Sequence, residues 1–173
     1  MAQKKDLELR AGQHPQHALA ATLLPAEPDE VLELDELWSF VGHKKNVVWL
    51  WVVLCRRTRQ VVAWMWGDRT ENTCQDLWAK VPASYKGAFC YSDLLAAYQK
   101  VLDKDHHRAC LKQEGQTNHI ERFNLTLRQR MARLVRKTLS FSKSLFMHIL
   151  SIRLFLHSYN LEQAHKYNKS CPI

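Results

Sequence analysis

Three acidic residues lie in surroundings that could give them a chemical role. Asp35 interrupts an apolar β-rich run, although Asp is depleted in strands and a buried carboxylate is costly unless it is paired or bound to metal. Asp93 ends the run "FCYSD" directly before a helical segment, where functional groups of α/β sheets often project. Glu121 begins a long helical pattern. If the three converge, their hard oxygen atoms suit two Mg²⁺ or Mn²⁺ ions and phosphodiester chemistry.

Each acid also has an ordinary interpretation. Strand alternation groups Asp35 with Glu33 and Ser39, so that face of the strand could simply be wet. Asp93 could cap the helix "LLAAYQK", and the two roles need not exclude each other. Glu121 could be a surface acid that favours the start of its helix through the macrodipole.

A cationic run follows Glu121 without any further acid up to residue 137. We predict that these residues contact a phosphate backbone, and the alternative is a merely solvated helix face: Arg122, Arg128, Arg130, Arg133, Arg136 and Lys137. The same segment carries one apolar helical stripe, formed by Ile120, Phe123, Leu127, Met131 and Leu134. Asn124 shares the flank of Glu121 and is a candidate to support it, and His119 could assist protonation or orient a phosphate.

Composition limits the class of protein. The 173 residues suffice for one main domain, and the formal charge of +8 with a pI near 9.4 favours a polyanionic partner, either nucleic acid or an anionic membrane surface. The five cysteines are widely spaced and indicate reduced cytosolic thiols rather than disulfides or a zinc ribbon. No signal-peptide core or membrane-spanning apolar run is present, so we expect a soluble cytoplasmic protein.

The elements that must position these residues follow the order β-β-β-α-β-α-β-α-α. Three β-rich runs, at 31–42, 46–57 and 59–68, predict an antiparallel meander whose middle strand is covered on both faces. Thr70 could cap a helix that Pro82 stops, and a strand at 87–93, a helix at 94–102 and a strand near 107–111 follow. Two C-terminal helices, one from 116 and one through 145–159, complete a mixed α/β fold in which helices flank the sheet. We assign 1–30 to a linker or partly ordered arm, 31–161 to the main domain and 162–173 to a tail.

Together these motifs resemble the DDE transposases of the bacterial insertion-sequence-one family. The resemblance rests on "LDELWSFVG", "YSDLLAAY" and above all "TNHIERFNLTLRQRMARLVRKTLSFSKS", and it runs from about Glu33 to Tyr159. It implies a ribonuclease-H-like catalytic core in which Asp35, Asp93 and Glu121 bind the metal ions. It also implies cleavage and strand transfer of an insertion sequence, acting on double-stranded element ends and target DNA.

The same resemblance implies partners. The family core usually operates with an upstream zinc-binding and helix-turn-helix portion, so this chain looks like the catalytic part. A homo-oligomer on DNA and association with the bacterial nucleoid are expected by analogy. Two other functions stay open: a nuclease of the same architecture that cuts without joining, and an inactive or domesticated DNA-binding module.

Overall fold

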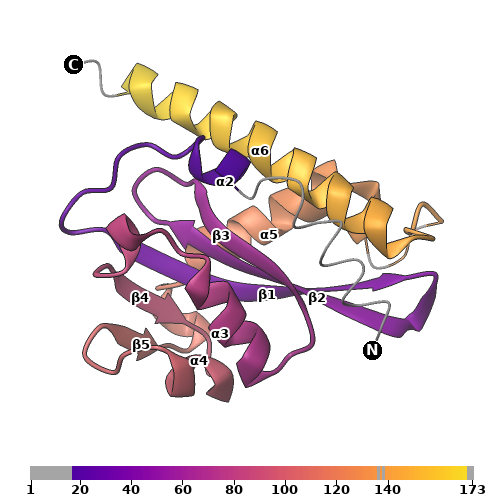
Figure 1. Cartoon of the computed structure of the whole chain (residues 1–173), viewed down its shortest axis with the longest axis horizontal. Helices are drawn as coiled ribbons and strands as arrows, with labels where there is room; N and C mark the ends of the chain where they lie inside the picture. Colours follow the sequence, from indigo (N-terminus) through magenta and orange to yellow (C-terminus); the bar gives the residue numbers. More distant parts are fainter. Residues whose placement is uncertain (1–16, 136, 138, 171–173) are drawn as a thin grey trace.

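The fold is a five-stranded mixed sheet with helices on both faces (Figure 1). A computed structural model describes residues 17–135, 137 and 139–170. The strands lie in the order β3-β2-β1-β4-β5, with bounds β1 Val31–Val41, β2 His43–Cys55, β3 Val61–Gly67, β4 Phe89–Ser92 and β5 His107–Ala109. The α-helices are α2 His17–Ala20, α3 Glu71–Ala79, α4 Ala96–Val101, α5 Asn118–Arg130 and α6 Leu145–Ser170. The expected mixed α/β class is confirmed.

The first three strands form the predicted antiparallel meander. Gly42 turns β1 into β2 with a φ of +72°, a left-handed conformation that glycine adopts without strain. The inner half of β2, from Leu50 to Cys55, is buried, as its continuous apolar sequence predicts. The centre of the completed sheet is nevertheless β1, because β4 and β5 add beyond it.

Two hydrophobic clusters fill the space between the sheet and its helices. On one face, Leu34 of β1 and Trp51 of β2 pack with α3 and α4 through residues such as Leu77. On the other face, Leu37 and Val52 pack with α5 and α6. Both faces of β1 are therefore covered over much of their length, which leaves little room for an unsatisfied charge.

The parallel pairing of β1 with β4 brings two of the acids together. The register aligns Leu34 with Ser92, and Asp35 and Asp93 are the next residues in the two chains. Parallel strands run in the same direction, so Asp35 and Asp93 lie side by side just after the last paired residues of β1 and β4.

The helices differ from prediction at their ends. Helix α3 begins after Thr70 as expected, but the Thr70 side chain makes no capping hydrogen bond. Helix α5 ends at Arg130 and does not continue to Leu134, because Met131 takes an extended backbone before a short 3₁₀ turn, η3, at Ala132–Leu134. Met131 and Leu134 still join the buried cluster beside α5.

The chain ends add to the α5/α6 face. Residues 162–170, expected to form a tail, continue α6 as helix. Within the predicted N-terminal arm, the Thr22 hydroxyl accepts a hydrogen bond from the side-chain amide of Asn160 on α6. The carbonyl of Leu24 accepts a hydrogen bond from the Tyr85 hydroxyl. Residues 1–16 of that arm lie outside the described part. Among the helices that the structure describes, none is both long and apolar enough to cross a membrane.

Candidate active site

Strand β1 carries acids on both of its faces. Glu33 and Asp35 share the face that packs against α5 and α6, whereas Glu36 lies on the face toward α3 and α4 with Leu34. The interpretation of Asp35 on a wet face is wrong, because its neighbours on that face, Glu33 and Ser39, are 0% and 2% exposed beneath the C-terminal helices.

Asp35 has few hydrogen-bond donors for a carboxylate in a mostly covered position. One oxygen accepts the backbone N–H of Glu36 at 2.8 Å, and the other accepts the side-chain amide of Asn124 at 2.8 Å. Burial first, and then the negative charges of Glu36, Asp93 and Glu121, raise the pKa of Asp35 to about 7 against the opposing hydrogen bond from the Glu36 N–H.

Asp93 lies where β4 gives way to the loop before α4. One of its oxygens accepts the backbone N–H of Leu95 at 2.9 Å, which is a local turn contact, since α4 begins only at Ala96 with Leu95 in the capping position. The prediction that Asp93 caps this helix is therefore wrong, because the helix begins two residues later than expected. Its other oxygen lies 3.7 Å from a guanidinium nitrogen of Arg69.

Glu36 is a fourth acid that we did not single out from the sequence. Its side chain is 2% exposed and accepts the Tyr98 hydroxyl at 3.0 Å and Nε of Arg69 at 2.7 Å. Burial first, and the nearby charge of Asp93 second, raise the pKa of Glu36. Strand alternation places Glu36 on the apolar face with Leu32 and Leu34, and that mismatch was a signal available in the sequence.

The carboxylates of Asp35, Glu36 and Asp93 form a compact cluster. One oxygen from each lies within 4.8 Å of the others. Glu121 is not part of this closest group among the described residues, although its charge reaches Asp35. The structure thus brings two of the predicted acids together with Glu36, and places the third nearby on α5.

Glu33 fixes the start of the helix that carries Glu121. Its carboxylate accepts the backbone N–H groups of His119 and Ile120, both at 3.0 Å, and it also contacts Nδ1 of His119 at 2.6 Å and Nε of Arg56 at 2.7 Å. A carboxylate at a helix N-terminus is electrostatically favourable. Glu121 itself accepts the hydroxyl of Thr117 at 3.1 Å.

The two supporting candidates have different neighbours. His119, at the start of α5, contacts Glu33. Glu33 precedes Asp35 by two residues on β1. Asn124 donates directly to Asp35, and its Oδ1 atom is buried without a hydrogen-bond partner among the described residues. An orphaned acceptor beside a crowded carboxylate is unusual, since buried polar atoms are nearly always satisfied.

The predicted cationic run does not lie along one helix. Arg122 is exposed on α5, whereas Arg128 donates to the carbonyl of Leu134 at 3.1 Å. Arg130 makes two hydrogen bonds to Glu162 of α6, an acid outside the run. Arg133 follows the helix on η3. Lys137 is exposed, and Arg136 lies outside the described residues.

The donors at this cluster fit a hard divalent cation. They are carboxylate oxygens from Asp35, Glu36 and Asp93, with the unpaired amide oxygen of Asn124 close by, and Mg²⁺ and Mn²⁺ prefer such ligands. Burial first, and then the neighbouring negative charges, raise the pKa values of Asp35 and Glu36. Arg69 supplies one positive charge from the α3 side.

Comparison with known proteins identifies relatives of this chain. A sequence model of the family described as "IS1 transposase" matches residues 30–162. A Shigella dysenteriae protein, "Insertion element iso-IS1n protein InsB", is 40% identical over 129 residues, covering 75% of this chain and 95% of the relative. "Insertion element IS1 protein InsB" of Shigella flexneri is 39% identical over 116 residues, covering 67% of this chain and 86% of the relative. An Escherichia coli K12 protein, "Insertion element IS1 4 protein InsB", is 37% identical over 116 residues, covering 67% of each chain.

Proposed function

This chain belongs to the IS1 transposase family, and from that premise we propose that Asp35, Asp93 and Glu121 hold the divalent metal ions with which it cuts and joins DNA. In the proposed metal-dependent reaction, water cleaves a phosphodiester at the end of an insertion sequence and frees a 3′-hydroxyl. This hydroxyl then attacks a phosphodiester of the target strand and releases a 3′-hydroxyl of the target. Its substrate is double-stranded DNA at the element ends and at the target site.

The proposal includes a ribonuclease-H-like core. An antiparallel meander followed by two parallel strands, with one acid in the central strand and one after its parallel neighbour, supports this assignment. In that core, β1 supplies Asp35, the end of β4 supplies Asp93 and α5 supplies Glu121. The proposed catalytic domain spans 31–161.

The observation that carries the proposal is the cluster formed by Asp35 and Asp93. Their oxygen atoms lie within 4.8 Å of each other and of Glu36, and burial among like charges raises the pKa of Asp35 to about 7. Perturbed carboxylates that converge from several elements are typical of functional sites. When bound, two Mg²⁺ or Mn²⁺ ions would activate the attacking oxygen and stabilise the leaving oxygen.

The protein's own contribution is to hold the acids and the DNA. Asn124 donates to Asp35, the Leu95 amide donates to Asp93, and the Thr117 hydroxyl donates to Glu121, so each acid has a fixed orientation. Asn124 therefore acts on the metal site through Asp35. For His119, the contact with Glu33 supports a role in holding α5 rather than in proton transfer.

The cations near α5 are proposed to contact the DNA phosphates. They would position the substrate without reading its sequence, and they comprise Arg122, Arg128, Arg130, Arg133, Arg136 and Lys137. The formal charge of +8 supports this role, and binding of this kind weakens steeply as salt rises. The proposal places the protein on the bacterial nucleoid, where this DNA lies.

Two further partners belong to the proposal. A companion portion with zinc-finger and helix-turn-helix elements would recognise the element ends. A second copy of the chain would pair through α6 at Leu154 and Leu161, which are 61% and 50% exposed and lie seven residues apart, as in helix–helix seams. Sedimentation with and without DNA measures this pairing.

The test combines a cleavage assay on an intact element end with a strand-transfer assay on a pre-cleaved end. Asp35→Asn, Asp93→Asn and Glu121→Gln should each reduce cleavage and joining by at least about 1,000-fold, since the metal ligands act as a unit. Glu71→Gln is the matched control, because the Glu71 side chain on α3 is 42% exposed and forms an ion pair with Lys100. Circular dichroism confirms that each variant folds.

The same assays separate the other two functions. Cleavage by the wild type without joining of the pre-cleaved end would indicate a nuclease. DNA binding that needs no metal, with neither cleavage nor joining, would indicate a DNA-binding module. Joining that persists in any of the three acid variants would refute the assignment of that acid.

A further inference from the structure

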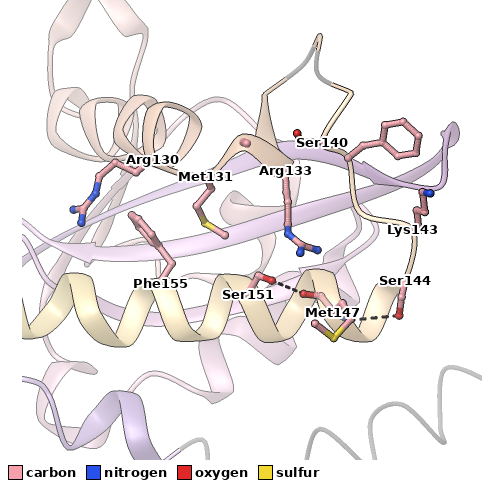
Figure 2. Close-up of a pocket in the computed structure, with 11 residues that line it drawn as sticks. Arg130, Met131, Arg133, Ser140, Lys143, Ser144, Met147, Ser151 and Phe155 are labelled. Atoms are coloured by element: carbon pink, nitrogen blue, oxygen red, sulfur yellow. Dashed lines mark hydrogen bonds between the residues drawn. The ribbon is translucent and has the colours of Figure 1, made fainter.

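An open groove of about 710 Å³ lies between the end of α5 and the first half of α6 (Figure 2). Met131 and Arg133 reach into it from the α5 side, and Phe155 rises toward it from α6. The 11 residues that line the groove are Arg130, Met131, Ala132, Arg133, Ser140, Phe141, Lys143, Ser144, Met147, Ser151 and Phe155. None of them is acidic.

The groove has a positive charge that the described residues compensate only in part. Arg130 is neutralised by Glu162. Arg133 contacts the hydroxyl of Ser142 at 3.4 Å, and neither Arg133 nor Lys143 has a carboxylate within ion-pair distance among the residues that the structure describes. Nδ1 of the buried His148 lies 2.9 Å from the Ser142 hydroxyl. Burial, and then the charge of Arg133, lower the pKa of His148 to about 4.

The floor of the groove is apolar and partly aromatic. The Arg130 guanidinium, which Glu162 holds, lies over the Phe155 ring at 5.2 Å from its centre, and the ring stacks on Tyr159 with 6.1 Å between ring centres. A base that stacks on Phe155 would therefore take the place of Arg130 on the ring. Cations beside an aromatic platform are the combination that proteins use for single-stranded nucleic acid, where phosphates meet the cations and bases stack on the rings. A duplex, with its bases already stacked, would use only the cations.

Helix α5 connects Glu121 to the groove, which the helix meets at Arg130. At 1.5 Å per residue these nine steps correspond to about 14 Å, or about four nucleotides at 3.4 Å per nucleotide of one strand. A strand that passes Glu121 could therefore reach Arg130, at the edge of the groove, within a few nucleotides.

We propose that this groove binds an unpaired DNA strand next to the cleavage site, with phosphates on Arg133 and Lys143 and a base against Phe155. This inference rests on the proposed function, because it takes DNA as the substrate and the acid cluster as the place of cleavage. It adds a site for one separated strand of the element end, and it assigns Arg133, one of the cations proposed above to contact DNA phosphates, to that strand.

The test measures binding of a labelled oligo-dT strand of about twelve nucleotides to the whole chain, with chelator present so that metal plays no part. The double variant Arg133→Gln, Lys143→Gln should weaken binding at least about tenfold and reduce the salt slope by about 1.4, which corresponds to two lost phosphate contacts. Lys100→Gln, Lys104→Gln removes the same charge from the α4 side and should leave both values close to the wild type.

Phe155→Leu tests the base contact while keeping an apolar side chain in the floor. It should weaken binding of the normal strand about tenfold but leave an abasic strand of equal length unaffected, and its melting temperature reports whether the fold survives. Equal losses for single strand and matched duplex in the charge variant would overturn the proposal, as would binding no weaker than in the control.

These outcomes are independent of the catalytic assignment. If Asp35→Asn abolishes cleavage but the groove variants bind as the wild type does, the groove proposal fails and the proposed function stands. If Asp35→Asn cleaves normally while the groove variants lose single-strand binding, the acid assignment fails and the groove proposal stands.

Discussion

Glu33 and Asp35 lie two residues apart on the same face of β1, yet their surroundings differ sharply. Glu33 is fully buried and accepts from two side chains and two backbone N–H groups. Asp35 has two donors and three acidic neighbours. The donors around Glu33 compensate its charge and anchor α5, whereas the charge of Asp35 is compensated by only two donors, which is consistent with the metal-binding role proposed for it.

Removing Glu33 should cause the largest loss of stability. Glu33→Ala leaves Arg56, His119 and two helix N–H groups without their acceptor, so we expect a loss of about 3–5 kcal/mol in the free energy of unfolding. Urea denaturation measures this loss. The exposed acid of the control Glu71→Gln should change stability by less than about 0.5 kcal/mol. A loss of similar size in both variants would mean that Glu33 does not anchor α5.

Neutralising Asp35 should have the opposite effect on stability. Its pKa rises from 3.8 to about 7 on folding, so its stabilising contribution is present below the unfolded value and is lost as pH rises through the folded value. Without metal, the free energy of unfolding of Asp35→Asn should therefore rise relative to that of the wild type as pH increases between these two pKa values, by at most about 1.4 kcal/mol per pH unit.

Denaturation of both proteins from pH 5 to 7.5 in chelating buffer measures this difference. Parallel stability curves for the wild type and the Asn variant would contradict the raised pKa. The same variant should be inactive, so a gain in stability together with a loss of function distinguishes Asp35 from Glu33.

The smallest expected effect comes from His119. His119→Gln loses one contact to Glu33 while the backbone N–H groups of α5 keep theirs, so stability should fall by about 1 kcal/mol. Strand transfer should stay within about tenfold of the wild type. A fall of about 100-fold or more, with the fold intact, would instead identify His119 as a proton-transfer group.

The parts of the site that could be predicted depend on short-range patterns. The three-strand meander and the α/β order follow from hydrophobic alternation and turn residues, and the position of Asp93 at a strand end could be read from its sequence neighbours. The closeness of Asp35 and Asp93 could only be hypothesised, because it depends on β4 pairing in parallel with β1 rather than at the other edge.

The missed features depend on contacts between distant segments. The role of Glu36 requires Arg69 and Tyr98, which approach it from the α3/α4 face. The end of α5 at Arg130 was missed because Met131 and Leu134 keep the helical spacing of apolar residues but reach the core through an extended residue and a 3₁₀ turn. Periodicity reports which side chains are buried, and the backbone can bury them in more than one way.

The contact between Glu33 and the start of α5 has a consequence for the order of folding. It joins residues 86 positions apart, whereas the β1–β2 hairpin joins close neighbours in the chain. Closing a long loop costs more entropy and is slower than forming a hairpin. During synthesis on the ribosome, the meander can therefore form well before α5 emerges, so a prematurely terminated chain would carry these strands but lack Glu121, one of the three acids proposed to bind metal.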